Sequence, residues 1–302
     1  MEVAGVLVVD KPAGPTSFEV VERVRRALRA RRAGHAGTLD PLATGVLAVC
    51  LGEGVKLQRF LAEGDKSYEA VVAFGAATDT EDAEGRVVER GDPGGLDAGA
   101  VEASLGGFTG EIEQVPPMFS AVRVGGRRLH EAARQGEELP RTPRRVAVHE
   151  LALLGFDPAR DGLARARLAV RCSKGTYVRT LAAGIGRAVG VPAHLAALRR
   201  TAAGPFTLSQ ALPLAEVERL GREDRAALAA RVVTAADALA FLPAIPVDER
   251  QARDLRQGRS LRLAAPAGLA RALDAGGRLV AVCQGGAGEA RPVRVWSAPG
   301  SP

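Results

Sequence analysis

The pattern of apolar and polar positions predicts short strands and helices from the first residues onward. An apolar run at residues 6–9 is followed by the turn sequence DKP, which predicts a buried strand. Apolar residues then recur at helical intervals from Phe18 to Leu28. Thr16 and Glu19 have the spacing of a capping box, so a helix is predicted there. Arginines on its other face would be either solvated or in contact with phosphates.

The middle of the chain predicts further strands separated by glycine-rich and acidic turns. Strand-like patterns occur at VLAVCL, SYEAVVAF, RVVER, MFSAVRV and RARLAVRC. The sequence SKGTYVRT is predicted to pass from a loop into a helix, and LRRTAAGPF to lead out of the main domain. Strands and helices are thus expected within the same domain.

Two changes in composition divide the chain. Residues 121–150 hold seven arginines and four glutamates together with glycine and proline, which predicts an excursion from the core. Two prolines in the apolar sequence LPAIPV predict a linker, so we expect a larger domain at 1–244 and a smaller one at 245–302. The smaller domain is predicted to be rich in strands, at SLRLAA, RLVAVC and PVRVW, and holds nine arginines, no lysine and five acidic residues.

Composition and charge narrow the classes of function. The 302 residues are 46% hydrophobic and 25% charged, which is ordinary for a globular protein and argues against disorder. The net charge of +6 favours a polyanionic partner such as nucleic acid. No apolar stretch is long enough to span a membrane, and the apolar N-terminal stretch is too short for a signal peptide. We therefore expect a cytoplasmic protein without a membrane span.

The cysteines do not indicate a metal site. Cys50, Cys172 and Cys283 are far apart, lie in apolar runs and lack CxxC or Cys/His ligand spacing. Buried free thiols in a reducing compartment explain them. The sequence therefore predicts no bound metal ion.

A glycine-rich loop, RAGHAGTLDPLATG, holds the first candidate for chemistry, Asp40. Glycines at positions 34, 37 and 45 would let the backbone approach a ligand closely, and Pro41 restricts Asp40 to an extended or turn conformation. Such a loop could hold a carboxylate at a pocket; the alternative is a turn in which Asp40 caps a following segment. The loop lacks the GxxxxGK[ST] pattern of ATP-binding loops, and a glycosidase pair would need a second carboxylate from the turn TDTEDAEG.

A second candidate site is the sequence SKGTYVRT, which places Tyr177 and Arg179 at the predicted start of a helix. A helix N-terminus attracts anions, and Arg179 could form a bidentate pair with a carboxylate. The alternative is a helix cap whose basic residues are solvated. Tyr68, in KSYEA, is a third candidate whose alternative role is that of an ordinary strand aromatic.

Taken together and in order, these segments resemble one family. The runs VDKPAGPTS, RAGHAGTLDPLATGVL, KSYEA, TDTEDAEG, PPMFSA, SKGTYVRT and LRR resemble those of the bacterial tRNA pseudouridine-55 synthases, the TruB family, over about residues 5–210. The tail resembles, more weakly, the PUA RNA-binding module. The resemblance implies an α+β pseudouridine synthase fold with a mixed, largely antiparallel sheet flanked by helices. It also implies a thumb-like insertion at about 121–150 and a small β-rich PUA-like domain.

The resemblance implies isomerisation of the T-loop uridine of tRNA without a metal or organic cofactor. Asp40 matches the catalytic aspartate, which either attacks the ribose C1′ or removes a C2′ proton, and Arg179 matches its ionic partner. Tyr68 matches the residue that stacks on the uracil and whose hydroxyl helps to remove the C5 proton. The remaining matches are expected to contact or support the substrate, namely His35, Tyr177, Leu198, Lys11 and Asp82.

The resemblance leaves alternatives of function open. A related synthase could act on other RNAs or with a guide RNA, although the basic run at 121–150 favours an enzyme that acts alone. A non-catalytic tRNA chaperone or RNA-binding protein is the alternative from a different class. We expect tRNA, bound through its T stem-loop, as the partner of a monomer that needs no obligate protein partner.

Overall fold

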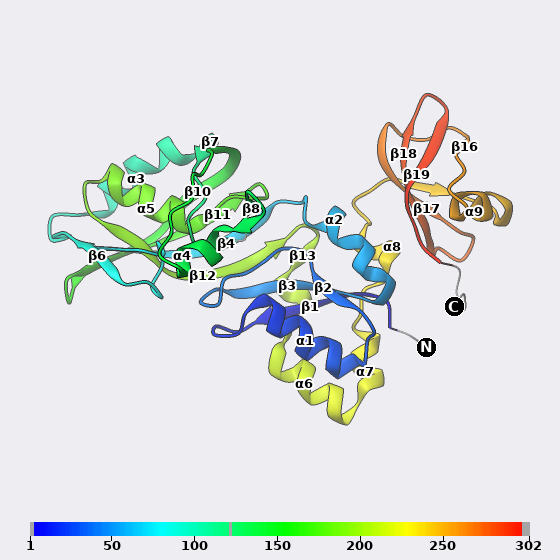
Figure 1. Ribbon diagram of the computed structural model, residues 1–302, viewed down its shortest axis with the longest axis horizontal. Helices are drawn as coiled ribbons and strands as arrows, with labels where there is room; N and C mark the ends of the chain where they lie inside the picture. The colour runs from blue at the N-terminus through cyan, green and yellow to red at the C-terminus, as the bar shows by residue number, and fades with distance from the viewer. Residues whose placement is uncertain (1–2, 121–122, 298–302) are drawn as a thin grey trace. The chain divides into compact units, whose positions relative to one another are not determined.

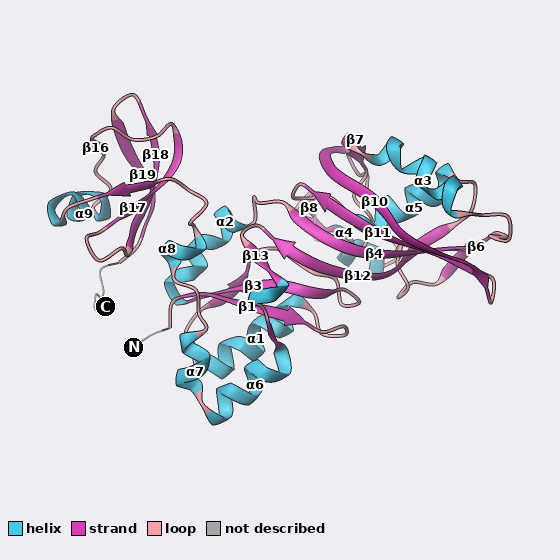
Figure 2. Cartoon of the chain, turned by 180° about the vertical axis from the view of Figure 1, so that it is seen from behind, coloured by secondary structure: helices cyan, strands magenta, loops and turns pink. Residues whose placement is uncertain are grey.

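The computed structural model describes residues 3–120 and 123–297 (Figure 1). By the contacts between their residues, they divide into two compact units. The first unit takes its described residues from Met1–Leu39, Val46–Ala62 and Pro205–Pro302, and the second from Asp40–Gly45 and Glu63–Gly204. Helices and strands occur in both units (Figure 2), which confirms the predicted α+β class.

The first unit contains the predicted N-terminal strand and helix. Its elements are β1 (Gly5–Lys11), α1 (Ser17–Leu28), β2 (Ala33–His35), most of β3 (Thr44–Leu51), η1 (Gly52–Leu57), α2 (Gln58–Leu61), β13 (Phe206–Thr207), η3 (Leu208–Gln210), β14 (Leu212–Pro213), α6 (Leu214–Glu223), α7 (Arg225–Ala230) and α8 (Ala235–Ala238). Strand β1 lies between β14 and β3, and β2 pairs with β3. The capping box is confirmed: the backbone NH of Thr16 donates to Glu19 and that of Glu19 to Thr16. The apolar face of α1 packs with α6 in the core.

The second unit is built on an antiparallel sheet. Its elements are β4 (Lys66–Phe74), β5 (Ala76–Thr78), β6 (Val87–Arg90), α3 (Ala98–Leu105), η2 (Gly106–Phe108), β7 (Gly110–Gln114), β8 (Arg123–Val124), β9 (Arg127–Arg128), α4 (Leu129–Arg134), β10 (Arg144–Arg160), β11 (Leu163–Cys172), α5 (Val178–Ala188) and β12 (Ala193–Ala203). The strand order is β12-β4-β11-β10-β7, and the first residues of β3 pair with β12 in parallel. Helices α3 and α5 contact each other and this sheet. The sheet is therefore mixed and largely antiparallel, as predicted.

The sequence LRRTAAGPF leads out of the second unit only at its end, since that unit ends at Gly204. Its residues 198–203 form the second half of β12, which pairs with β4. The register of this pairing shifts between Leu195 and Ala197 and again between Arg200 and Ala202. These irregularities break the two-residue alternation that identifies a strand in a sequence, and the adjacent arginines hide it further.

The basic excursion is shorter than the expected range. In the predicted strand MFSAVRV, residues 118–120 form bends, residues 121–122 lie outside the described part, and β8 holds only Arg123–Val124. The predicted Gly-Gly turn joins β8 to β9, with positive φ at both glycines. Residues 144–150 lie instead in β10, where Val146 and Val148 are buried. The segment outside the main sheet therefore ends near residue 143.

The C-terminal part of the first unit contains a sheet of its own. Its elements are β15 (Ala244–Pro246), α9 (Glu249–Arg256), β16 (Leu261–Arg262), β17 (Gly268–Leu273), β18 (Leu279–Gly286) and β19 (Glu289–Val295), with the strand order β15-β17-β18-β19-β16. The predicted strands correspond to β16, β18 and β19, whereas β17 and α9 were not predicted. Leu255 of α9 packs into the apolar core of this sheet together with Val280 and Ala270.

Candidate active site

Hydrogen bonds on both sides of Asp40 hold the loop that carries it. The hydroxyl of Ser17 donates to the carbonyl of Leu39 and accepts from its NH, both at 2.8 Å. The carbonyl of Asp40 accepts from the NH of Ala43 at 3.1 Å, which closes a β-turn with Pro41 at its second position. Asp40 therefore follows a buried anchor and begins a turn, so its backbone direction is fixed.

Gly45 and Gly34 have another role than the predicted approach to a ligand. Gly45 has φ of 102°, and a Cβ atom there would lie 2.2 Å from the backbone oxygen of Arg200. A Cβ atom at Gly34 would lie 2.3 Å from the side-chain nitrogen of Gln58. Protein atoms fill both places, but only at Gly45 are they backbone atoms, so packing requires glycine there. At Gly45 that packing is the close pairing of β3 with β12.

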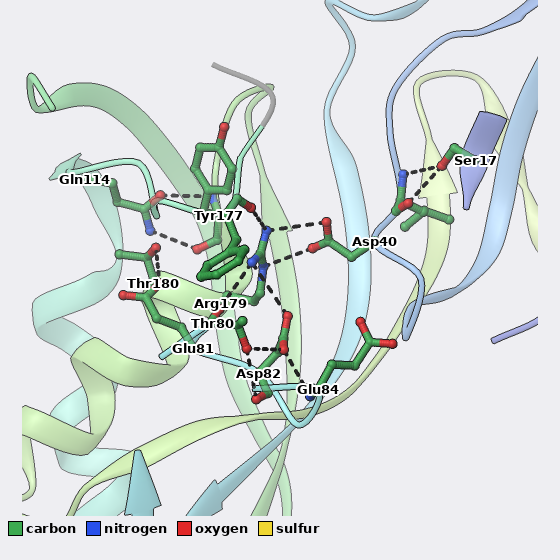
Figure 3. A network of polar contacts seen from close by, with 12 residues as sticks. Ser17, Asp40, Thr80, Glu81, Asp82, Glu84, Gln114, Tyr177, Arg179 and Thr180 are labelled. Atoms are coloured by element: carbon green, nitrogen blue, oxygen red, sulfur yellow. Dashed lines mark hydrogen bonds and ion pairs between the residues drawn. The ribbon is translucent and has the colours of Figure 1, made fainter. Parts of the chain in front are cut away.

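Arg179, on the first turn of α5, brings Asp40 and Asp82 together, as Figure 3 shows. Its Nε lies 3.0 Å from one Asp40 oxygen, and its Nη2 lies 3.4 Å from the other. Its Nη1 lies 3.6 Å from Asp82. The guanidinium also donates to the carbonyls of Thr80 and Phe119, at 3.2 and 2.9 Å. This two-point contact with Asp40 fixes the orientation of that carboxylate.

Asp40 and Asp82 differ in their access to solvent. The Asp82 side chain is 5% exposed, whereas that of Asp40 is 34% exposed. Asp82 also accepts from the hydroxyl of Thr80 at 2.6 Å and from the NH of Glu84 at 3.1 Å. A buried carboxylate with these partners serves structure, so Asp40 is the one available to a ligand. The guanidinium favours its ionised form.

Tyr68 lies on β4 beside a residue that the sequence did not identify, Arg200 of β12. Arg200 is 2% exposed and donates a hydrogen bond to the phenol oxygen. Burial raises the pKa of Tyr68, and the charge of Asp40 raises this pKa further, while Arg200 opposes the shift. Tyr68 is therefore a neutral hydroxyl within the electrostatic range of Asp40.

The other predicted residues divide between the two units. In the second unit, the backbone NH of Tyr177 donates to the Gln114 side chain at 2.9 Å, and Leu198 is buried on β12. In the first unit, Lys11 is fully buried and donates to the carbonyl of Pro12, and His35 lies on β2. The second unit thus brings together Asp40, Tyr68, Arg179 and Asp82.

Sequence reasoning missed several polar groups of this network. The carbonyls of Thr80 and Phe119 carry no residue-type signal, because every residue has a carbonyl. Gln114 holds the backbone of Tyr177 at both its NH and its carbonyl. Arg200 could have been found only by recognising LRR as part of a buried strand.

The arrangement orients a carboxylate within the electrostatic range of a neutral phenol. This set of groups suits attack on, or proton removal from, an electrophilic carbon, followed by a proton transfer through the hydroxyl. Within residues 3–120 and 123–297, no three His, Cys, Asp or Glu side chains come together as metal ligands would. None of the helices in these ranges is long and apolar enough to cross a membrane.

Comparison with known proteins identifies the family of this chain. A sequence model of the "TruB family pseudouridylate synthase (N terminal domain)" matches residues 25–178. The chain belongs to this family. Two further models of the TruB family match later segments: "tRNA pseudouridylate synthase B C-terminal domain" at residues 179–240 and "tRNA Pseudouridine synthase II, C terminal" at 242–297.

Relatives extend the TruB match over most of the chain, and a solved structure shares the fold. The tRNA pseudouridine synthase B of Symbiobacterium thermophilum is 49% identical over 85% of this chain and 83% of its own length. The protein of the same name from Aromatoleum aromaticum is 48% identical over 89% and 83%. A chain in the crystal structure of a Cbf5-Nop10-Gar1 complex has a TM-score of 0.74 at 24% identity, over 98% of this chain and 84% of its own. That likeness confirms the predicted pseudouridine synthase fold.

Proposed function

We propose that this protein converts a uridine in the T-loop of tRNA, position 55, into pseudouridine. The observation that carries this proposal is the pairing of the partly exposed Asp40 with the buried Arg179. Family membership and the names of its relatives, which are tRNA pseudouridine synthases, support tRNA as the substrate. We expect the protein to act in the cytoplasm, as a monomer and without a guide RNA.

Asp40 performs the first chemical step. The reaction breaks the C1′–N1 bond of the uridine, rotates the uracil and joins C1′ to C5. Asp40 either attacks C1′ or removes a C2′ proton, and both routes require the ionised carboxylate. Arg179 supplies the countercharge that keeps it ionised where water is excluded.

Tyr68 acts on the uracil in two ways. A uridine within a folded loop must be flipped out, at a cost of a few kcal/mol, and stacking on an aromatic ring recovers about 1–3 kcal/mol. After C1′ joins C5, the C5 proton leaves through the Tyr68 hydroxyl. Because its pKa is raised, Tyr68 acts as a relay and not as a phenolate base: its hydroxyl takes up the C5 proton as its own proton passes to the freed Asp40 carboxylate.

The remaining predicted residues support the substrate. Leu198 forms an apolar wall of the uracil pocket, and Tyr177 contacts the flipped nucleotide. Asp82 holds Arg179, while Lys11 supports the loop of Asp40 and His35 packs against the RNA. The thumb-like insertion, expected at about 121–150 and ending near residue 143, closes on the RNA. The RNA is recognised mainly by shape and phosphates.

The C-terminal residues 245–302 form an RNA-binding module that follows a catalytic domain at 1–244. The module holds nine arginines and five acidic residues, and therefore a net charge of +4. Deleting the module should weaken tRNA binding and make that binding less dependent on salt. The single-turnover rate at saturating tRNA should stay within a fewfold of the parent rate. A collapse of that rate in a folded truncated protein would show that the module belongs to the active site.

Asp40→Asn tests the function most directly. The parent should form pseudouridine at one position of unmodified tRNA without any added RNA, whereas Asp40→Asn should form none. Because phosphate contacts dominate affinity, Asp40→Asn should bind tRNA with a Kd within about threefold of the parent. Asp157→Asn, at an exposed position of β10, is the matched control and should keep full activity.

The outcomes separate the proposed function from the alternatives. Multiple turnover by pure Asp40→Asn would remove Asp40 from the chemistry. A parent protein that binds and refolds tRNA but forms no pseudouridine would be a chaperone. Modification of another RNA but not of tRNA would overturn the substrate.

A further inference from the structure

Glu81 has a backbone conformation that is unusual for its residue type. It lies in the acidic turn between Thr80 and Asp82, with φ of 63°. A side chain other than glycine costs about 1–2 kcal/mol in this left-handed region. Such a cost persists only where the surroundings fix the residue, and it often marks a functional constraint.

The contacts of Glu81 fix it from two sides. Its carbonyl accepts from the NH of Leu195 on β12 at 3.0 Å. Its carboxylate accepts from the hydroxyl of Thr180 at 2.7 Å. Thr180 follows Arg179 in the first turn of α5, so Glu81 ties the acidic turn to the start of that helix (Figure 3).

The reversal of the chain at Glu81 determines which groups of the acidic turn contact Arg179. The residue before Glu81 offers its carbonyl to Arg179 Nη1 at 3.2 Å, and the residue after it places a carboxylate 3.6 Å from the same nitrogen. Both contacts depend on the turn between them. Glu81 itself does not contact Arg179, so its influence passes through Thr80, Asp82 and Thr180.

We infer that Glu81 is a positioning residue for Arg179 and, through it, for Asp40. The inference rests on the proposed function. Its carboxylate acts as a clamp between the acidic turn and α5, and the backbone strain at residue 81 is retained because that clamp aligns the guanidinium. If residue 81 were only a turn residue, glycine would serve better there, since glycine adopts this φ without strain.

Glu81→Gly therefore separates the two roles. It relieves the strain and removes the clamp, while a cavity of about 590 Å³ beside Glu81 and Thr180 lets water satisfy the freed hydroxyl. We expect an unchanged or higher melting temperature, a Kd for tRNA within twofold of the parent and a single-turnover rate about tenfold lower. Glu81→Gln keeps an acceptor for Thr180 and should stay within threefold of the parent rate.

A double-variant cycle and a matched control complete the test. Thr180→Val removes the donor of the clamp and should also slow the reaction about tenfold, while Glu81→Gly with Thr180→Val should be no slower than either alone. Asp161→Gly relieves a similar left-handed strain, φ of 53°, in the turn between β10 and β11, and should leave the rate unchanged. Equal rates for Glu81→Gly and the parent, or additive losses in the cycle, would overturn the inference.

A readout without catalysis distinguishes this inference from the proposed function. The NMR signal of the Arg179 Nε–H group, assigned by its absence in Arg179→Lys, should shift in Glu81→Gly and remain in place in Glu81→Gln. An unshifted signal in Glu81→Gly overturns the role of Glu81 even if the parent forms no pseudouridine. An inactive parent whose signal shifts as expected would overturn only the proposed function.

Discussion

Arg179 and Arg200 are both buried in the second unit, yet their surroundings differ. Arg179 meets the carboxylates of Asp40 and Asp82 together with two backbone carbonyls. Arg200 meets the phenol of Tyr68 and lies near another buried cation, Lys66. Burial, and next to it the charge of Arg200, lower the pKa of Lys66.

The two arginines therefore have different neighbours within the same unit. Arg179 contacts the Asp40 carboxylate at two points. Around Arg200, burial outweighs the cation, so the pKa of Tyr68 is raised and its hydroxyl keeps its proton. The first region supplies the nucleophile or base of the proposed reaction, and the second supplies the proton relay.

The largest effect is expected at Arg179. Arg179→Gln leaves the buried Asp82 without its cation, and breaking a buried pair on one side typically costs about 3–5 kcal/mol of stability. The single-turnover rate should fall at least ~1000-fold, because Asp40 loses both its countercharge and its orientation. Stopped-flow mixing with tRNA measures the loss of rate, and urea unfolding measures the loss of stability. A stable Arg179→Gln protein with a normal rate would show that Arg179 has neither role.

Tyr68→Phe should have the next largest effect. The ring face is kept, so tRNA should bind normally, but the hydroxyl that we propose as the carrier of the C5 proton is lost. A positioned proton-transfer group contributes about 100-fold to 10,000-fold, so the single-turnover rate should fall at least ~100-fold. Tyr68→Leu should also lose affinity, because stacking is lost. A phenylalanine variant within a fewfold of the parent would leave Tyr68 with stacking alone.

A smaller effect is expected for Arg200→Gln, which keeps a donor near the phenol but removes the charge. The single-turnover rate should fall about tenfold, in line with the loss of one charge-assisted hydrogen bond. In a Tyr68→Phe background the same change should have no further effect, since the hydroxyl on which Arg200 acts is gone. Equal losses in both backgrounds would show that Arg200 acts elsewhere.

The smallest effect concerns alkaline stability. An exposed tyrosine has a pKa of 10.0, and burial raises the pKa of Tyr68 above this value. The stabilisation from a neutral Tyr68 is thus complete below pH 10 and is lost as the pH rises through the folded-state value, by at most about 1.4 kcal/mol per pH unit. Tyr68→Phe should lose less free energy of unfolding between pH 10 and 11 than the parent.

The difference in alkaline loss of stability between the parent and Tyr68→Phe reports on Tyr68, because the other buried groups are common to both proteins. Burial raises the pKa of Cys50 to about 12 and of Cys172 to about 11, so both proteins lose stability above pH 9 through their thiols. Identical alkaline losses in the parent and Tyr68→Phe would show that Tyr68 ionises as freely when folded as when unfolded.

The sequence predicted the Arg179 region far better than the Arg200 region, and the reason is physical. Asp40 lies between a glycine-rich run and a proline, and Arg179 starts a helix, so local patterns mark both. Arg200 lies on a strand whose pairing shifts register on both sides, which removes the alternation. When a strand is stabilised by pairing with residues that are distant in the sequence, its own residues do not suffice to predict it.

The fold was predicted in the same uneven way. The capped helix α1 and the strands β3, β4 and β11 follow strong local periodicity and were correctly expected. The two compact units have no counterpart in the local patterns, because the first unit joins segments from both ends of the chain. Such contacts are set by packing, which single-sequence patterns do not record.

The close approach at Gly45 has a consequence for how this protein can evolve. Its glycine is required by the backbone of Arg200 and not by a substrate, so an inactive descendant that kept the fold would still need glycine there. Asp40 would be under no such steric constraint, so substitutions would accumulate at this position. A lineage that retains Gly45 but varies at Asp40 is therefore expected to have lost the catalytic activity while keeping the fold.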